Sequence, residues 1–231
     1  MVENRKSSSI DEKWSGLARL GGYACVAMLV IMAAQMIVFI MWPPPDTVLD
    51  LFNLFQKNAF LGLLSMDLLY VVNNSVLILI YLALYTALKP VNESAALVAL
   101  VSGLVGIAAY YPSNTAFEML ALSRQYAAAL NDAQRLIYQS AGQAMLETYG
   151  GTAFDMYYVL NAAALLIFAV LMFRSPSFSK TIAAIGLASG ILMTIPSTAG
   201  TLGLIFSLAS LLPWAVFLVL ITPRFFRLGH K

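Results

Sequence analysis

The chain has 231 residues, of which 61% are hydrophobic and only 10% are charged, and its mean hydropathy is +0.82. A soluble domain carries about a quarter charged residues, so this composition excludes a water-soluble fold, which could not bury so much apolar surface. The net charge of +2, without a block of basic residues, argues against nucleic acid as a partner. These values predict an all-α fold, a polytopic membrane helix bundle forming a single membrane domain over residues 1–231.

The chain opens with a polar tail, residues 1–18, and a first apolar segment follows at 20–42. That segment is too long for the core of a signal peptide, and Trp42-Pro43-Pro44-Pro45 is a poor cleavage site. We therefore expect a retained first membrane helix. Cys25 lies inside it and is the only cysteine, so no intramolecular disulfide can form.

Six segments are long and apolar enough to cross a hydrocarbon core of about 30 Å. The fifth is short, and its separation from the sixth rests on the turn-prone stretch Pro196-Ser197-Thr198-Ala199-Gly200. Without that turn the chain would have five spans, and its C-terminus would lie on the other side of the membrane. The predicted spans are residues 20–42, 60–88, 95–111, 153–173, 181–195 and 202–221.

The placement of Lys and Arg predicts the orientation of these spans. With the N-terminus inside, ten basic residues fall on the inner side, whereas only Lys57, Arg124 and Arg135 fall on the outer side. Basic residues concentrate in cytoplasmic loops, so we expect both termini, including the tail 222–231, to face the cytoplasm. This bias also favours an even number of spans.

Two segments on the predicted outer side are substantial. Residues 43–58 contain an amphipathic stretch, and residues 113–151 have helical composition with few helix breakers before Gly150. A loop of this length without its own structure would be unusual. We therefore expect both to form helical segments that cap the outer face. The simpler alternative is a pair of connecting helices with no role in ligand binding.

The pattern Asp-x-x-Tyr-Val-x-Asn occurs twice, once from Asp67 to Asn73 and once from Asp155 to Asn161. Each copy opens a predicted span, which leads to a basic loop with a proline and then to a helix carrying Ser-Gly and Pro-Ser. Both copies run in the same direction through the membrane. They therefore predict a parallel internal repeat of helices 2–3 and 4–5, related by an axis along the membrane normal.

On an ideal helix, Asp67, Tyr70 and Asn74 fall within an arc of about 60°. A polar stripe this narrow should face the bundle interior, because polar groups are costly in lipid. The second copy has fewer polar residues on its stripe. If the stripes line an outward-facing pocket between helices 2 and 4, the candidate ligand-binding residues are Asp67, Tyr70, Asn73, Asn74, Asp155, Tyr158 and Asn161.

Each of these residues could instead have a purely structural role and bind no ligand. For the two aspartates, and for Asn73 and Asn161, the structural role is the favoured interpretation of the single residue. Asp67 and Asp155 lie near the outer boundary, where a carboxylate can cap a helix or interact with its dipole. Asn73 and Asn161 lie deeper and can form hydrogen bonds between helices, typically contributing about 0.6–2 kcal/mol.

Recognisable catalytic and cofactor motifs are missing from the sequence. His230 is the only histidine and Cys25 the only cysteine, which excludes a zinc or haem ligand pair and a Cys-His nucleophile. Neither a phosphate-binding glycine loop nor a nucleophile elbow is present. Asp67, Asp155 and Glu118 could supply oxygen ligands to a hard cation, but nothing fixes their spacing. We expect no catalytic residue, no metal and no cofactor. Whether the chain is an enzyme stays open, although the missing motifs argue against an enzyme.

Two stretches carry a family resemblance. The end of the chain, from Leu211-Leu212-Pro213-Trp214 to Pro223-Arg224-Phe225-Phe226-Arg227-Leu228-Gly229, and the inner loop Lys89-Pro90-Val91-Asn92 resemble the bacterial domain-of-unknown-function family 4386 of multi-spanning membrane proteins. The six-helix layout is similar too, and residues 113–151 fit least well. The resemblance implies a protein of the cytoplasmic (inner) membrane of a prokaryote and lends no catalytic residue.

Two functions fit these observations. The first is binding or transport of a small molecule or lipid through a polar pocket between helices 2 and 4 on the outer side. The second is a non-catalytic interaction or accessory subunit of a membrane complex, whose polar stripes hold helices together. The expected partners are membrane lipids, with a small-molecule ligand in the first case and a membrane protein in the second. A cavity reaching the asparagines would favour the first, and direct bonds of the asparagines in a dry core would favour the second.

Overall fold

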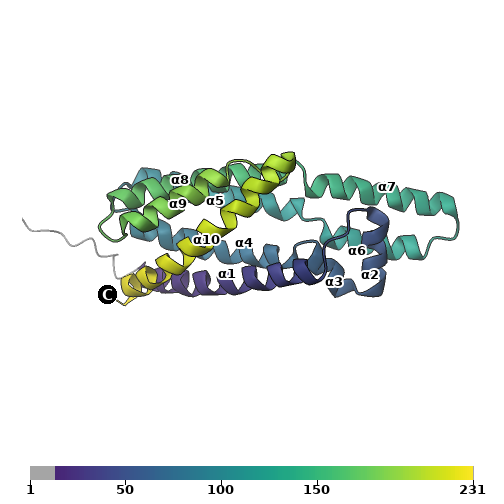
Figure 1. The fold of residues 1–231 in the computed structure, drawn as a ribbon, viewed down its shortest axis with the longest axis horizontal. Helices are drawn as coiled ribbons and strands as arrows, with labels where there is room; N and C mark the ends of the chain where they lie inside the picture. The colour runs from purple at the N-terminus through teal and green to yellow at the C-terminus, as the bar shows by residue number, and fades with distance from the viewer. Residues whose placement is uncertain (1–13, 231) are drawn as a thin grey trace, which may run out of the picture. The chain divides into compact units, whose positions relative to one another are not determined.

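The computed structural model describes residues 14–230, and every element in that part of the chain is a helix (Figure 1). Most of the predicted tail 1–18 therefore lies outside the described residues. The elements are α1 (Ser15–Met41), α2 (Val48–Lys57), α3 (Ala59–Ser65), α4 (Leu68–Leu88), α5 (Glu93–Ser113), α6 (Ala116–Ala127), α7 (Asp132–Tyr149), α8 (Thr152–Arg174), α9 (Lys180–Leu192) and α10 (Gly200–Gly229).

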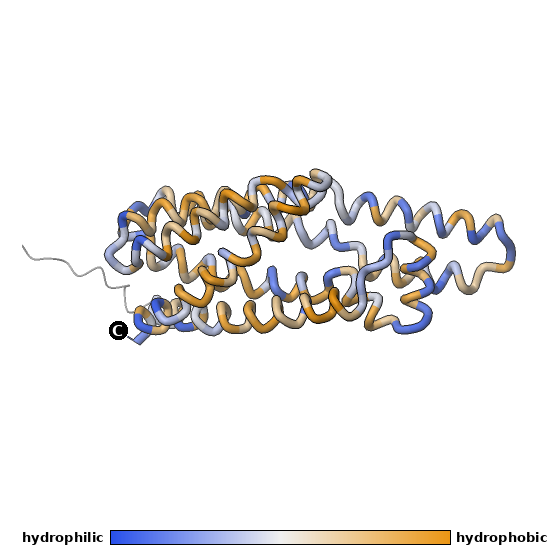
Figure 2. The backbone as a smooth tube through the Cα atoms, viewed as in Figure 1, coloured by the Kyte–Doolittle hydropathy of each residue, from blue (hydrophilic) through white to orange (hydrophobic). Residues whose placement is uncertain are grey.

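Five helical stretches among the described residues are long and apolar enough to cross a membrane: Ser15–Met41, Leu68–Leu88, Glu93–Ala127, Asp132–Arg174 and Gly200–Gly229. Figure 2 shows hydrophobic residues along most of α1 and α10, whereas hydrophilic and hydrophobic residues alternate along α7. The chain is therefore a multi-pass membrane protein.

The predicted fifth span corresponds to α9, which has only 13 residues. At 1.5 Å per residue it is about 20 Å long, shorter than the hydrocarbon core. The turn predicted at 196–200 is present: α9 ends before it, and Gly200, the first residue of α10, has a φ of +65°. The count of six spans, which requires α9 to cross, stays a prediction, as does the parallel repeat.

The chain divides into two compact units. Unit 1 comprises the described residues of Met1–Leu29, Ser75–Ile107 and Tyr158–Lys231. Unit 2 comprises Val30–Asn74 and Ala108–Tyr157. Each unit therefore combines segments that are far apart in the sequence.

In unit 1, small residues allow close helix packing. A Cβ atom on Gly103 of α5 would lie 2.4 Å from the ring of Tyr81 on α4, and one on Gly186 of α9 would lie 2.9 Å from the ring of Phe217 on α10. Close approach over small residues is a common way for helices to associate in membranes.

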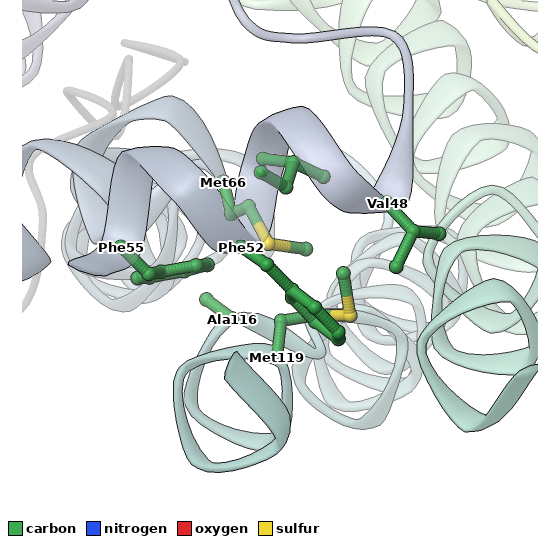
Figure 3. Packing of buried hydrophobic residues seen from close by; sticks show 7 residues of the cluster. Val48, Phe52, Phe55, Met66, Ala116 and Met119 are labelled. Carbon is green, nitrogen blue, oxygen red and sulfur yellow. The ribbon is translucent and has the colours of Figure 1, made fainter. Parts of the chain in front are cut away.

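In unit 2, α2, α6 and α7 pack together around one hydrophobic cluster (Figure 3). Thr47 starts α2, because its side-chain oxygen accepts a hydrogen bond from the amide of Asp50 over 3.2 Å. The apolar face of α2 then buries Phe52 and Phe55 against Met119 of α6. The predicted helices in 43–58 and 113–151 are confirmed; their position on the outer face stays a prediction.

The predicted span 60–88 is not one continuous helix: it is interrupted between α3 and α4, and only Leu68–Leu88 is a candidate membrane span. Asp67 lies at this break with a φ of +61°, in the left-handed region. Side chains from elsewhere in unit 2 bind carbonyls there: Gln35 Nε2 donates to the carbonyl of Leu64 over 3.4 Å, and Asn114 Nδ2 to that of Met66 over 2.9 Å. These tertiary contacts stabilise an interruption that no local glycine or proline requires.

Candidate functional site

The centre of the candidate site is the carboxylate of Asp67 at the α3–α4 break. The backbone carbonyl of Asp67 starts α4, accepting from the amides of Tyr70 over 2.9 Å and Val71 over 3.1 Å. Its half-buried side chain instead accepts a hydrogen bond from the hydroxyl of Tyr149, the last residue of α7. The carboxylate thus points toward α7 rather than capping its own helix.

Four aromatic residues of unit 2, Tyr70, Tyr110, Tyr149 and Tyr157, form what we call the tyrosine cluster. The hydroxyls of Tyr70 and Tyr157 lie 2.8 Å apart. The ring of Tyr110 packs against both, with centroid distances of 5.3 Å to Tyr70 and 5.1 Å to Tyr157. Tyr149 joins the cluster through Asp67, to whose carboxylate its hydroxyl donates. The cluster therefore gathers π-faces and hydroxyls from α4, α5, α7 and α8 beside one carboxylate.

Buried acceptor oxygens without a hydrogen-bond partner accompany this cluster in unit 2. Asn74 is fully buried; its Nδ2 donates to the carbonyl of Tyr70 over 3.1 Å, but its Oδ1 accepts nothing from the described residues. The same holds for Asn73 Oδ1, Ser65 Oγ and Gln35 Oε1. Because an unsatisfied buried polar group costs about 1–3 kcal/mol, such acceptors are suited to a ligand that donates hydrogen bonds.

The structure places the seven predicted site residues in two groups. Asp67, Tyr70, Asn73, Asn74 and Asp155 belong to unit 2, with Asp155 in the first turn of α8. The two others, Tyr158 and Asn161, belong to unit 1. The copies of the motif also differ locally, because Asp67 precedes its helix whereas Asp155 lies inside one.

Both of the unit 1 residues make direct contacts. The hydroxyl of Tyr158 lies 2.7 Å from Oγ of Ser207 on α10. Asn161 Oδ1 accepts a buried hydrogen bond of 2.6 Å from the hydroxyl of Tyr81 on α4. This bond between helices is the structural use predicted for the asparagine. The ligand-binding role of the seven residues as one set stays a prediction.

Sequence reasoning missed most of the site's supporting residues. Tyr110, Asn114 and Tyr149 lie outside the repeated motif, and Gln35 lies in a different predicted span. Tyr157 stands inside the second copy of the motif, at a position that the pattern leaves variable. No spacing rule could connect these residues to Asp67, because they are separated from it by at least 32 positions along the chain.

The described residues contain no group of three or more His, Cys, Asp and Glu side chains placed to hold a metal ion. Asp67, Asp155 and Glu118 are therefore not gathered in such a group. The groups that the printed contacts bring together are the carboxylate of Asp67, aromatic faces and neutral acceptors.

The comparisons with known proteins identify a family without an assigned activity. Neither the curated proteins nor the solved structures include a match to this chain. A family model described as a domain of unknown function, DUF4386, matches residues 20–223. The chain therefore belongs to the DUF4386 family and is a multi-span membrane protein.

Proposed function

We propose that unit 2 binds a small organic cation or amine at the α3–α4 break, as the recognition step of a binding or transport protein. The ligand class follows from the donor and acceptor inventory. A carboxylate and neutral amide oxygens accept hydrogen bonds from N–H groups, and tyrosine faces attract cations. Among the described residues Asp67 makes no ion pair, so a cationic ligand would supply the missing positive charge.

The single observation that carries this proposal is the interruption between α3 and α4. A non-glycine residue with positive φ costs free energy and persists when its surroundings fix it. Here Gln35 of α1, Asn114 of the α5–α6 connection and Tyr149 of α7 do so. At membrane depth, non-helical backbone is tolerated only where protein buries it or where it lines a cavity. Interrupted helices build substrate sites in many transporters.

The membrane placement of the site is also part of the proposal. The ten-to-three distribution of basic residues favours six spans with both termini in the cytoplasm. Asp67 would then lie near the outer boundary of the inner membrane of a prokaryote. A ligand would enter from the outer side.

The test is amine-dependent stabilisation of the purified full-length chain in nanodiscs. Methylammonium, choline and spermidine are the probes, with sodium chloride at equal ionic strength as the reference. We expect at least one amine to raise the unfolding temperature, because ligands that bind the native state stabilise it. Asp67→Asn should abolish this shift. Asp132→Asn, which removes an almost fully exposed carboxylate from α7, is the matched control and should retain it.

Two outcomes would refute amine binding at Asp67. One is that no amine stabilises the native chain more than sodium chloride does. The other is that Asp67→Asn and Asp132→Asn respond alike. A folded Asp67→Asn variant is expected, because asparagine also tolerates the left-handed backbone conformation.

A second candidate function, the accessory subunit, is favoured by a different observation. Large apolar side chains are exposed in the connection between α6 and α7 and on α7 itself. Leu130 in the connection is 90% exposed, and Leu136 and Ile137 on α7 are more than 60% exposed. Large apolar groups that gather on a surface mark interaction sites. Under this proposal, Ile137→Glu should dissociate a defined complex seen by native mass spectrometry of mildly solubilised membranes. Amine binding should remain unchanged in that variant.

A further inference from the structure

A cavity of about 370 Å³ lies within unit 1, between the start of α9 and the last turns of α10. Ser179, which precedes α9, and Thr181 of α9 line one side of it, and Arg224 and Arg227 of α10 line the other. Leu220 and Pro223 of α10 contribute part of its apolar wall. Both helices pack directly against each other, and their positions are visible in Figure 1. The cavity thus combines two cationic side chains, two hydroxyls and an apolar surface.

Among the described residues, no acidic side chain forms an ion pair with the positive charge of this cavity. Arg224 and Arg227 are three residues apart and so share one face of α10. Neither forms a salt bridge with a described residue. The sequence after Asp155 contains no Asp or Glu. Among the described residues of unit 1 the one acidic residue is Glu93, which accepts a hydrogen bond from the hydroxyl of Tyr85.

The first turn of α9 adds hydrogen-bond donors to the same cavity. Ser179 caps this helix, accepting from the amide of Ile182 over 3.3 Å. The amides of the first helical residues have no partner within the helix, and a helix N-terminus carries partial positive charge that favours anions. The ammonium group of Lys180 points elsewhere, because it donates to the carbonyl of Phe173. The donors available to a ligand are therefore guanidinium groups, hydroxyls and helix amides.

We propose that this cavity binds a phosphate group. Arginine matches phosphate oxygens through two parallel hydrogen bonds. The phosphate could belong to an anionic phospholipid headgroup or to free inorganic phosphate. The predicted cytoplasmic position of Arg224 and Arg227 and the apolar wall favour the lipid, because basic pockets between helices on that side bind anionic headgroups. This proposal concerns unit 1 and does not rest on amine binding in unit 2.

The experiment measures lipid binding to the full-length chain by native mass spectrometry, after delipidation in detergent. The probes are phosphatidylglycerol, phosphatidylcholine and inorganic phosphate. Phosphatidylglycerol should bind more tightly than phosphatidylcholine, and Arg224→Gln/Arg227→Gln should weaken its binding at least tenfold. The control Arg124→Gln/Arg135→Gln removes the same charge from α6 and α7 and should leave binding unchanged.

Two further variants separate the phosphate site from a general charge effect and from misfolding. Arg224→Lys/Arg227→Lys keeps the charge but loses the planar guanidinium geometry, so its affinity should lie between those of the native chain and the glutamine pair. Thr181→Val removes one hydroxyl donor without changing charge and should weaken binding several-fold. If the glutamine pair does not fold, these two variants carry the test.

The probes distinguish the two sources of phosphate. If phosphatidylglycerol binds and millimolar inorganic phosphate does not displace it, the ligand is a lipid headgroup. If inorganic phosphate binds by itself and competes with the lipid, the site takes free phosphate. The proposal is overturned if neither probe binds, or if binding is the same in the glutamine pair, the lysine pair, Thr181→Val and the native chain. It is also overturned if the Arg124→Gln/Arg135→Gln control loses as much affinity as the glutamine pair.

Discussion

The hydroxyl of Tyr81 on α4 donates a buried hydrogen bond of 2.6 Å to Oδ1 of Asn161 on α8. The ring of Tyr81 also packs 5.9 Å from that of Phe168, and Gly103 of α5 approaches its edge. One side chain thus connects three helices of unit 1 through a polar bond and close apolar packing. These contacts of Tyr81 hold α4, α5 and α8 together in unit 1.

The bond between Tyr81 and Asn161 should contribute measurably to stability. Tyr81→Phe keeps the ring but leaves the oxygen of Asn161 buried and unpaired, so we expect a loss of about 1–2 kcal/mol. The free energy of unfolding in mixed micelles is the measurement. Tyr85→Phe, which removes a long and exposed hydrogen bond to Glu93, should cost clearly less. Equal losses in the two variants would show that the buried bond contributes no more than an exposed one.

Replacement of Gly103 should destabilise unit 1. A Cβ atom there would lie 2.4 Å from the Tyr81 ring, which is held by Asn161 and Phe168 and so cannot move freely. Gly103→Ala should cost about 1–3 kcal/mol as an overpacking change. Gly16→Ala meets nothing within 4 Å and should be neutral or stabilising. Thermal unfolding of both variants in the same detergent gives the comparison; a stabilising Gly103→Ala would contradict this packing.

The positive φ of Asp67 predicts that the glycine variant at this position is more stable than the alanine variant. Glycine adopts positive φ without a steric penalty, whereas alanine pays about 1 kcal/mol or more. Asp67→Gly should therefore be more stable than Asp67→Ala by about 1 kcal/mol, although both lose the bond to Tyr149. At an ordinary helical position the order is reversed. Unfolding experiments that find alanine more stable would place Asp67 in a continuous helix.

The predicted topology can be tested by cysteine labelling. Cys25 is buried in α1, and a Cys25→Ala background removes its thiol. Arg135→Cys in that background should react with a membrane-impermeant maleimide added from outside, whereas Lys89→Cys and Arg174→Cys should react only in inverted vesicles. Labelling of Arg135→Cys from the cytoplasmic side would exclude the model with six spans and both ends inside.

Several local features could be read from the sequence because neighbouring residues determine them. Apolar runs long enough for a membrane place α1, α4, α5, α8 and α10 close to their observed bounds, apart from the start of α4 and the C-terminal extension of α10. The helix α2 follows from its amphipathic pattern and the capping side chain of Thr47. The turn before Gly200 separates α9 from α10 because glycine accepts its positive φ. The resemblance to the DUF4386 family is confirmed over residues 20–223.

The tertiary structure alone decided the α3–α4 break and the surroundings of Asp67. The local sequence Ser65-Met66-Asp67-Leu68 contains no helix breaker, and the break is stabilised by Gln35, Asn114 and Tyr149. Hydropathy and periodicity describe each segment by itself, whereas these contacts depend on which segments meet in three dimensions. For the same reason the repeated motif could not reveal that Asp67 is bound by Tyr149 while Asn161 is bound by Tyr81.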